Sequence, residues 1–65
     1  MSTLNDEWLR VFGTEFGNVA QLAFLTSQGF ADGDLQDRWM QFLEAEGYAE
    51  GAFNDRLFAY LRGQP

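Results

Sequence analysis

The sequence contains no cysteine, no histidine and no lysine, and its single proline is the last of the 65 residues. Without cysteine, neither a disulfide framework nor a thiolate metal site can form. Without histidine, lysine or a thiol, the usual general bases, Schiff-base amines and strong nucleophiles are missing, so Ser2 and Ser27 have no base to activate them. We therefore predict that the protein is not an enzyme and binds no cofactor.

A calcium site is the one metal hypothesis that the acidic residues suggest. The segment Asp32-Gly33-Asp34 followed by Asp37 resembles the start of an EF-hand loop. Such a loop needs a carboxylate at its twelfth position, which here is Leu43, and its glycine belongs at the sixth position. Because the register fails, we predict no metal site.

Long apolar runs are also absent. No stretch could span a bilayer, and no charged segment followed by an apolar run marks a signal peptide. We expect one small cytoplasmic domain over residues 1–65, near the lower size limit at which a core holds without covalent cross-links. Seven Phe, two Trp and two Tyr provide a large apolar area for that core.

Positive charge is scarce. Ten acidic residues face four arginines, which gives a net charge of −6. This balance argues against direct binding of nucleic acid or of an anionic membrane, both of which need a basic surface. It favours a basic partner, although a charge of this size is also ordinary for a small soluble domain.

Hydrophobic periodicity predicts an all-α fold of four short helices. Thr3 caps the first helix and Gly13 ends it, and Thr14 caps a second helix that runs to about Gln28. Residues 16–25 have almost no polar face, so we predict that the second helix lies in the centre, covered by the others. The third helix follows residue 33 and ends before residue 47, and the fourth covers residues 53–62.

Three segments share one scheme of large apolar residue, amide, Asp, charged residue and large apolar residue, at residues 4–8, 35–39 and 53–57. They predict amphipathic helices whose apolar faces pack on a common core. The expected core contains Trp8, Phe24, Trp39, Phe42, Leu57 and Leu61. Leu9, Met40 and Phe58 lie at the edges of the three stripes; they either widen the buried faces or form an exposed docking patch.

Most acidic residues have a local explanation, because a carboxylate near the start of a helix stabilises the helix through a favourable interaction with its dipole. Glu44 and Glu46 lack one, since they lie in the last turn of the third helix with no basic residue near them in the sequence. Residues 32–50 hold six acidic residues and one arginine, a local net charge of −5. The expected partner-binding face comprises Asp32, Asp34, Asp37, Glu44, Glu46 and Glu50.

Spacing along the third helix adds a geometric argument. Asp37 and Glu44 share a face about 10.5 Å apart along the axis, with Asp34 about 4.5 Å further back. Such a row resembles the phosphates of a duplex, which repeat every ~3.4 Å along each strand. We therefore expect a monomeric mimic of double-stranded DNA that occupies a basic groove. The competing hypotheses are a generic acidic interaction module and a small adaptor or phage assembly protein that docks through an apolar groove.

In size, charge and helix content, the whole chain resembles the small acidic helical inhibitors that bacteriophages encode against host defence. Among these it looks most like an anti-CRISPR inhibitor of the type I-C Cascade complex. No motif is shared residue by residue. The resemblance implies a DNA mimic that acts in the host cytoplasm, occupies the DNA-binding groove of Cascade and blocks target recognition.

Overall fold

A computed structural model describes residues 3–65, and these residues form four helices and no strand. The helices are α1 (Leu4–Phe12), α2 (Asn18–Ser27), α3 (Leu35–Ala45) and α4 (Phe53–Arg62). The prediction of an all-α fold is therefore confirmed.

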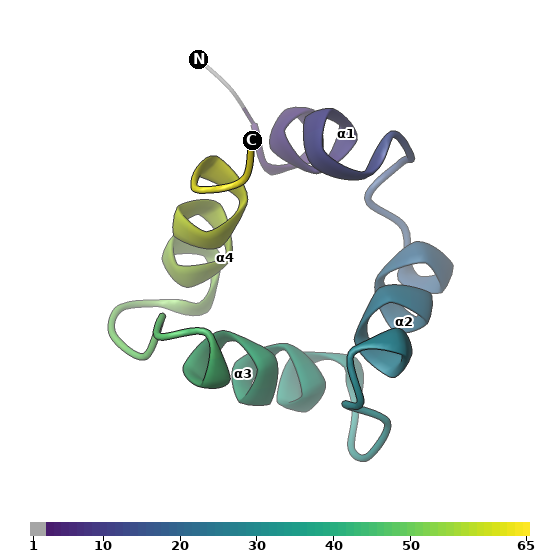
Figure 1. The fold of residues 1–65 in the computed structure, drawn as a ribbon, viewed down its shortest axis with the longest axis vertical. Helices are drawn as coiled ribbons and strands as arrows, with labels where there is room; N and C mark the ends of the chain where they lie inside the picture. The colour runs from purple at the N-terminus through teal and green to yellow at the C-terminus, as the bar shows by residue number, and fades with distance from the viewer. Residues whose placement is uncertain (1–2) are drawn as a thin grey trace.

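The four helices follow one another around a flattened ring, which Figure 1 shows face-on. The molecule measures 32 × 26 × 18 Å along its principal axes. The backbones of α2 and α3, of α3 and α4, and of α4 and α1 approach closely, whereas those of α1 and α2 do not. At the α1–α2 corner the helices meet through aromatic side chains, Trp8 and Phe12 against Phe24, whereas α4 packs back on α1 and closes the ring, and the C-terminus lies beside the start of α1 (Figure 1).

The first helix begins as predicted. Thr3 Oγ1 accepts a hydrogen bond from the Asp6 amide at 3.2 Å, and an Asp6 carboxylate oxygen accepts one from the Thr3 amide at 3.1 Å. This reciprocal arrangement is a capping box, which satisfies two amides that the helix leaves unpaired. Gly13 ends α1 in the left-handed conformation, with φ of 72°.

The predicted start of the second helix is wrong. Helix α2 begins at Asn18, with Gly17 at its N-cap and no side-chain cap. Thr14, the expected cap, instead has its hydroxyl 3.2 Å from the indole nitrogen of Trp8, from which it accepts a hydrogen bond. A tryptophan whose side chain is fully buried needs an acceptor for its N–H, and this tertiary requirement outweighs the local capping preference of Thr14.

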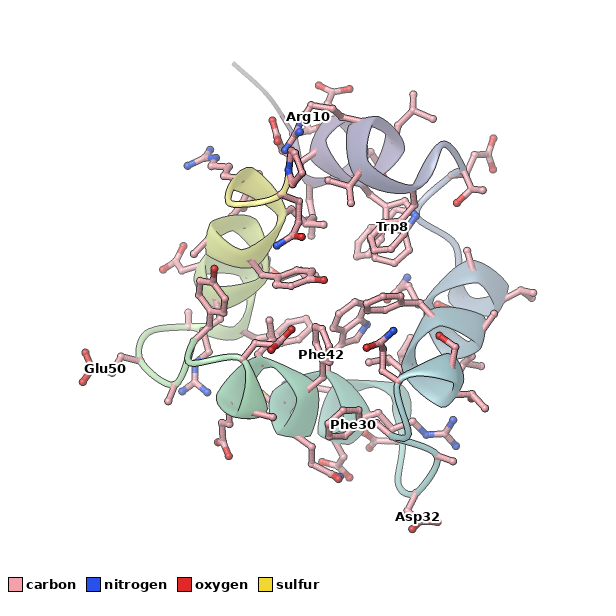
Figure 2. All side chains as sticks on the ribbon, viewed as in Figure 1. Trp8, Arg10, Phe30, Asp32, Phe42 and Glu50 are labelled. Carbon is pink, nitrogen blue, oxygen red and sulfur yellow. The ribbon has the colours of Figure 1, made fainter. Side chains whose placement is uncertain are left out.

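The central position predicted for the second helix is also wrong. Helix α2 forms one side of the ring, and only Gln21 and Leu25 on it are buried. Val19 has 83% of its surface exposed. Figure 2 shows the reason, because side chains directed inward from all four helices fill the middle and leave no space there for a helix.

An aromatic cluster occupies the centre of the ring. Trp8 and Trp39 lie edge to face with centroids 5.8 Å apart, and Phe24 stacks on Trp39 at 5.8 Å. The buried core consists of Trp8, Leu25, Trp39, Phe42, Leu43, Leu57, Tyr60 and Leu61. Five of the six predicted core residues are among these, and the sixth, Phe24, is partly buried against them.

An 18-residue pattern recurs in tandem at residues 29–46 and 47–64, and six of the 18 aligned positions (Gly, Ala, Gly, Asp, Arg and Leu) are identical. Each copy supplies one corner of the ring and the helix that follows it. In each copy an arginine donates through Nε to the carbonyl oxygen of a glycine five residues earlier, Arg38 to Gly33 and Arg56 to Gly51, both at 2.9 Å. The two glycines have φ of 93° and 95°, a conformation that glycine adopts without a steric penalty.

The side-chain packing repeats as well. The Phe30 ring meets Phe42 with centroids 5.7 Å apart and planes at 84°, and its counterpart Tyr48 meets Tyr60 at 5.9 Å and 86°. The two corners that flank α3 therefore have the same construction.

Candidate functional site: an acidic edge along α3

All six predicted partner-binding residues are exposed. Asp32 lies in the α2–α3 loop and Glu50 in the α3–α4 loop, and both point outward at opposite ends of α3 (Figure 2). The six acids therefore extend from one end of α3 to the other without forming a cluster, and Asp37 and Glu46, nine residues apart, project from opposite faces of the helix. We call Asp32, Asp34, Asp37, Glu44, Glu46 and Glu50 the acidic edge.

Two members of the acidic edge stabilise the start of α3. Asp34 is the N-cap, and its carboxylate accepts a hydrogen bond from the Asp37 amide at 2.8 Å. Asp37 lies in the first turn, where its negative charge favours the helix dipole. Both carboxylates remain exposed, so they contribute to the outward potential as well as to the helix.

Glu44 has a basic neighbour, contrary to the inference from the sequence. One of its carboxylate oxygens lies 3.8 Å from Arg56 Nη1, on the adjacent helix α4. The Arg56 side chain is only 14% exposed, whereas that of Glu44 is 60% exposed. This ion pair is missed by sequence reasoning because it joins two helices. Solvent screens it, so its contribution to stability is small.

Glu46 and Glu50 have no such partner. Neither carboxylate forms a hydrogen bond or an ion pair with residues 3–65. Glu46 lies at the C-cap of α3, where a negative charge opposes the helix dipole. The pKa of Tyr60 is raised above its usual 10.0, mainly because the ring is buried and further because the negative charge of Glu46 is near. Neither glutamate is thus explained by local stability.

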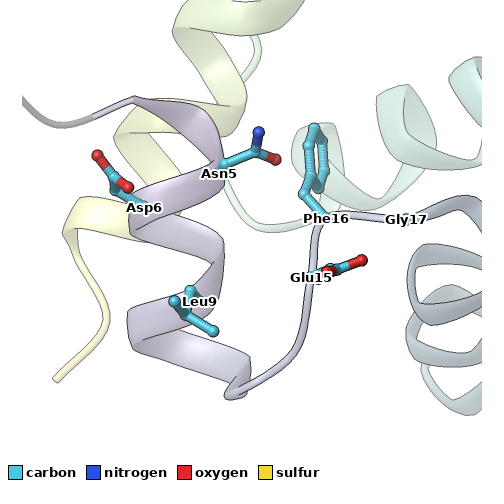
Figure 3. A pocket seen from close by; sticks show the side chains of 6 residues that line it. All are labelled: Asn5, Asp6, Leu9, Glu15, Phe16 and Gly17. Atoms are coloured by element: carbon cyan, nitrogen blue, oxygen red, sulfur yellow. The ribbon is translucent and has the colours of Figure 1, made fainter.

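A second surface feature, which the sequence did not reveal, lies at the α1–α2 corner. A groove of about 400 Å³ separates α1 from the connection to α2 (Figure 3). Its lining consists of Asn5, Asp6, Leu9, Glu15, Phe16 and Gly17. Leu9 is 54% exposed, so it does not widen the buried face of its helix. Met40 and Phe58, the other two stripe-edge residues, are half-buried.

Within residues 3–65, no three acidic side chains are placed to hold a metal ion together. No helix in this range has the length and apolar character needed to cross a membrane. The chain matches no protein-family model, no curated protein and no solved structure.

Proposed function

We propose that the protein is a non-catalytic inhibitor that binds the basic groove of a nucleic-acid-binding complex through the acidic edge of α3. The observation that carries this proposal is the exposure of six carboxylates along α3 and its two flanking loops, of which Glu46 and Glu50 form no hydrogen bond or ion pair among residues 3–65. Unpaired charges of one sign attract an oppositely charged surface and accelerate its encounter.

The geometry suits a mimic of double-stranded DNA. The acidic edge extends from the corner before α3 to the corner after it, because Asp32 and Glu50 occupy equivalent places in the two tandem copies. The members between these two lie on α3 or at its caps, and α3 is packed on both α2 and α4, so the central part of the edge is carried on a rigid element. A basic groove built for a regular line of phosphates would meet carboxylates on a similarly extended line.

The host complex proposed as target is the type I-C CRISPR Cascade, with the protein acting as a phage-encoded anti-CRISPR in the host cytoplasm. Support comes from the small size and net charge of −6, together with the acidic edge. The direct test is whether purified Cascade still binds a labelled target duplex in its presence. We expect a stoichiometric excess to abolish the Cascade–DNA complex. Undiminished DNA binding at that excess contradicts the proposal.

A second candidate function is that of a small adaptor or phage assembly protein that docks through an apolar surface. The groove beside Leu9 favours it, because a leucine that is 54% exposed contributes apolar area outside the core. The two functions differ in salt dependence: high salt weakens binding through exposed charges and leaves apolar docking largely unchanged.

A further inference from the structure

Leu9, Met40 and Phe58 occupy equivalent positions, since each is the sixth residue of its helix in the shared scheme of α1, α3 and α4. At two of these positions an arginine covers the apolar side chain. Arg56 Nη1 lies 3.8 Å from the sulfur of Met40. Arg62 places its guanidinium carbon 4.7 Å from the centre of the Phe58 ring.

The third position has no such cover among residues 3–65. Arg10, the only arginine of α1, is directed elsewhere: its two terminal nitrogens donate to the carbonyls of Gln64 and Leu61 at 2.9 and 2.7 Å. Leu9 is left exposed at the edge of the groove.

The groove has the chemistry that an arginine side chain requires. Leu9 lies on the α1 side of the groove and Phe16 on the side of the connection to α2 (Figure 3), where its ring also packs against Trp8 with centroids 5.1 Å apart. A guanidinium group packs well on such surfaces, and its methylene stem covers aliphatic carbon. Glu15, on the same lining, has a carboxylate without a hydrogen bond or ion pair to residues 3–65. It can accept two parallel N–H bonds from the planar guanidinium.

We propose that this groove binds an arginine side chain presented by a partner protein. The bound arginine would lay its methylene stem on Leu9, a position at which α3 and α4 each carry an apolar residue that contacts an arginine of this chain. Charge complementarity identifies the occupant, because the groove supplies carboxylates and no cation. A second copy of this chain is disfavoured, since two molecules with a net charge of −6 repel each other.

This site is independent of the acidic edge. Helices α1 and α3 lie on opposite sides of the ring (Figure 1), so the groove and the edge can be altered separately. The inference therefore does not rest on the inhibitor function proposed above.

The test is an NMR titration of the intact protein with the peptide acetyl-Gly-Arg-Gly-amide. Peptides that carry lysine or citrulline in place of arginine serve as probes of geometry and charge. We expect the largest amide shifts at residues 9 and 15–17, and an affinity for the arginine peptide roughly two- to fivefold above that for lysine. Citrulline, which keeps the shape and loses the charge, should bind more weakly still.

Matched variants locate the site. Leu9→Ser and Glu15→Gln should each weaken binding of the arginine peptide about two- to fivefold. The control variants Val19→Ser and Asp55→Asn remove an exposed apolar side chain and an exposed charge outside both the groove and the acidic edge, and should bind like the parent. Equal binding of arginine and lysine, equal effects of groove and control variants, or shifts confined to α3 would each overturn the proposal.

Discussion

A buried hydrogen bond between two side chains links α2 to α3. The indole nitrogen of Trp39 donates to the side-chain oxygen of Gln21 at 3.0 Å, and both residues are buried. Gln21 is the only buried polar residue among residues 3–65. It joins α2 to α3 in a place where an apolar side chain would leave the indole N–H without a partner.

Replacing Gln21 by leucine should therefore destabilise the protein. We expect Gln21→Leu to lower the free energy of unfolding by about 1–3 kcal/mol, because a buried donor loses its acceptor. Denaturant unfolding measures this, with Gln41→Leu as the matched control: Gln41 is exposed on α3, where such a change alters stability by less than about 0.5 kcal/mol. Equal stabilities of the two variants would show that the bond contributes nothing.

The raised pKa of Tyr60 predicts that the protein loses stability at alkaline pH. Burial and, secondarily, Glu46 raise the pKa of its phenol above the usual 10.0, so the unfolded chain releases the proton first as pH rises. The Tyr60 contribution is fully present below pH 10.0 and declines above it, with a slope of at most about 1.4 kcal/mol per pH unit. Unfolding free energies across this range should fall more steeply for the parent than for Tyr60→Phe. Identical slopes for the parent and for Tyr60→Phe would contradict the raised pKa of Tyr60.

At the scale of helices, the sequence predicts most of the fold because the amphipathic pattern and the caps are local. The capping box of Thr3 and Asp6 and the glycine end of α1 follow from that pattern. The start of α2 does not, since Thr14 is occupied by the indole N–H of a buried tryptophan six residues earlier.

The prediction that α2 lies in the centre fails for a related reason. Its apolar residues suggest burial on all sides, yet Val19 is almost fully exposed and Leu25 is buried. Periodicity indicates that a helix has apolar faces, but it does not indicate how many neighbours the helix will have. The tandem copies are not apparent from the helices alone, because the corner glycines that mark each copy lie between helices.

Arg10 adds two hydrogen bonds to the packing of α1 on α4 at the corner where the ring closes. Its guanidinium donates to the carbonyl of Leu61, in the last turn of α4, where the helix leaves carbonyls unpaired. The second bond, to Gln64, holds the segment beyond the helix. Both bonds join residues more than fifty positions apart in the sequence.

Arg10→Met, which retains an apolar stem, should lower the free energy of unfolding by about 1–2 kcal/mol, because two carbonyl acceptors lose a charged donor. It should also increase amide hydrogen exchange in the last turn of α4. Arg62→Met is the control, since the guanidinium of Arg62 contacts Phe58 on its own helix. If both variants unfold alike, Arg10 does not secure the corner.

At the scale of the whole molecule, the candidate site divides into parts that the sequence could and could not predict. Exposure of the six acids follows from their polarity and from their places in loops or on the polar positions of α3 and its caps. The pairing of Glu44 with Arg56 and the groove beside Leu9 arise from contacts between segments distant in the sequence. Single-sequence patterns carry no information on those contacts.

The role of the acidic edge is best tested by the salt dependence of binding to purified type I-C Cascade. The double variant Glu46→Gln with Glu50→Gln neutralises two carboxylates that have no local partner, and Glu7→Gln with Asp55→Asn neutralises two outside the edge. Glu7 accepts a hydrogen bond from Arg10 at 3.2 Å, which the amide oxygen of a glutamine can still accept. Each double variant changes the net charge from −6 to −4, because two negative charges are removed.

We predict that the edge variant binds roughly three- to tenfold more weakly than the parent at low salt, because each exposed charge contributes a few tenths of a kcal/mol to about one. The decline of affinity with salt should also be shallower for the edge variant, while the control variant should match the parent on both measures. If the two double variants have the same affinity and the same salt dependence, the acidic edge is only a solvated surface and DNA mimicry is contradicted.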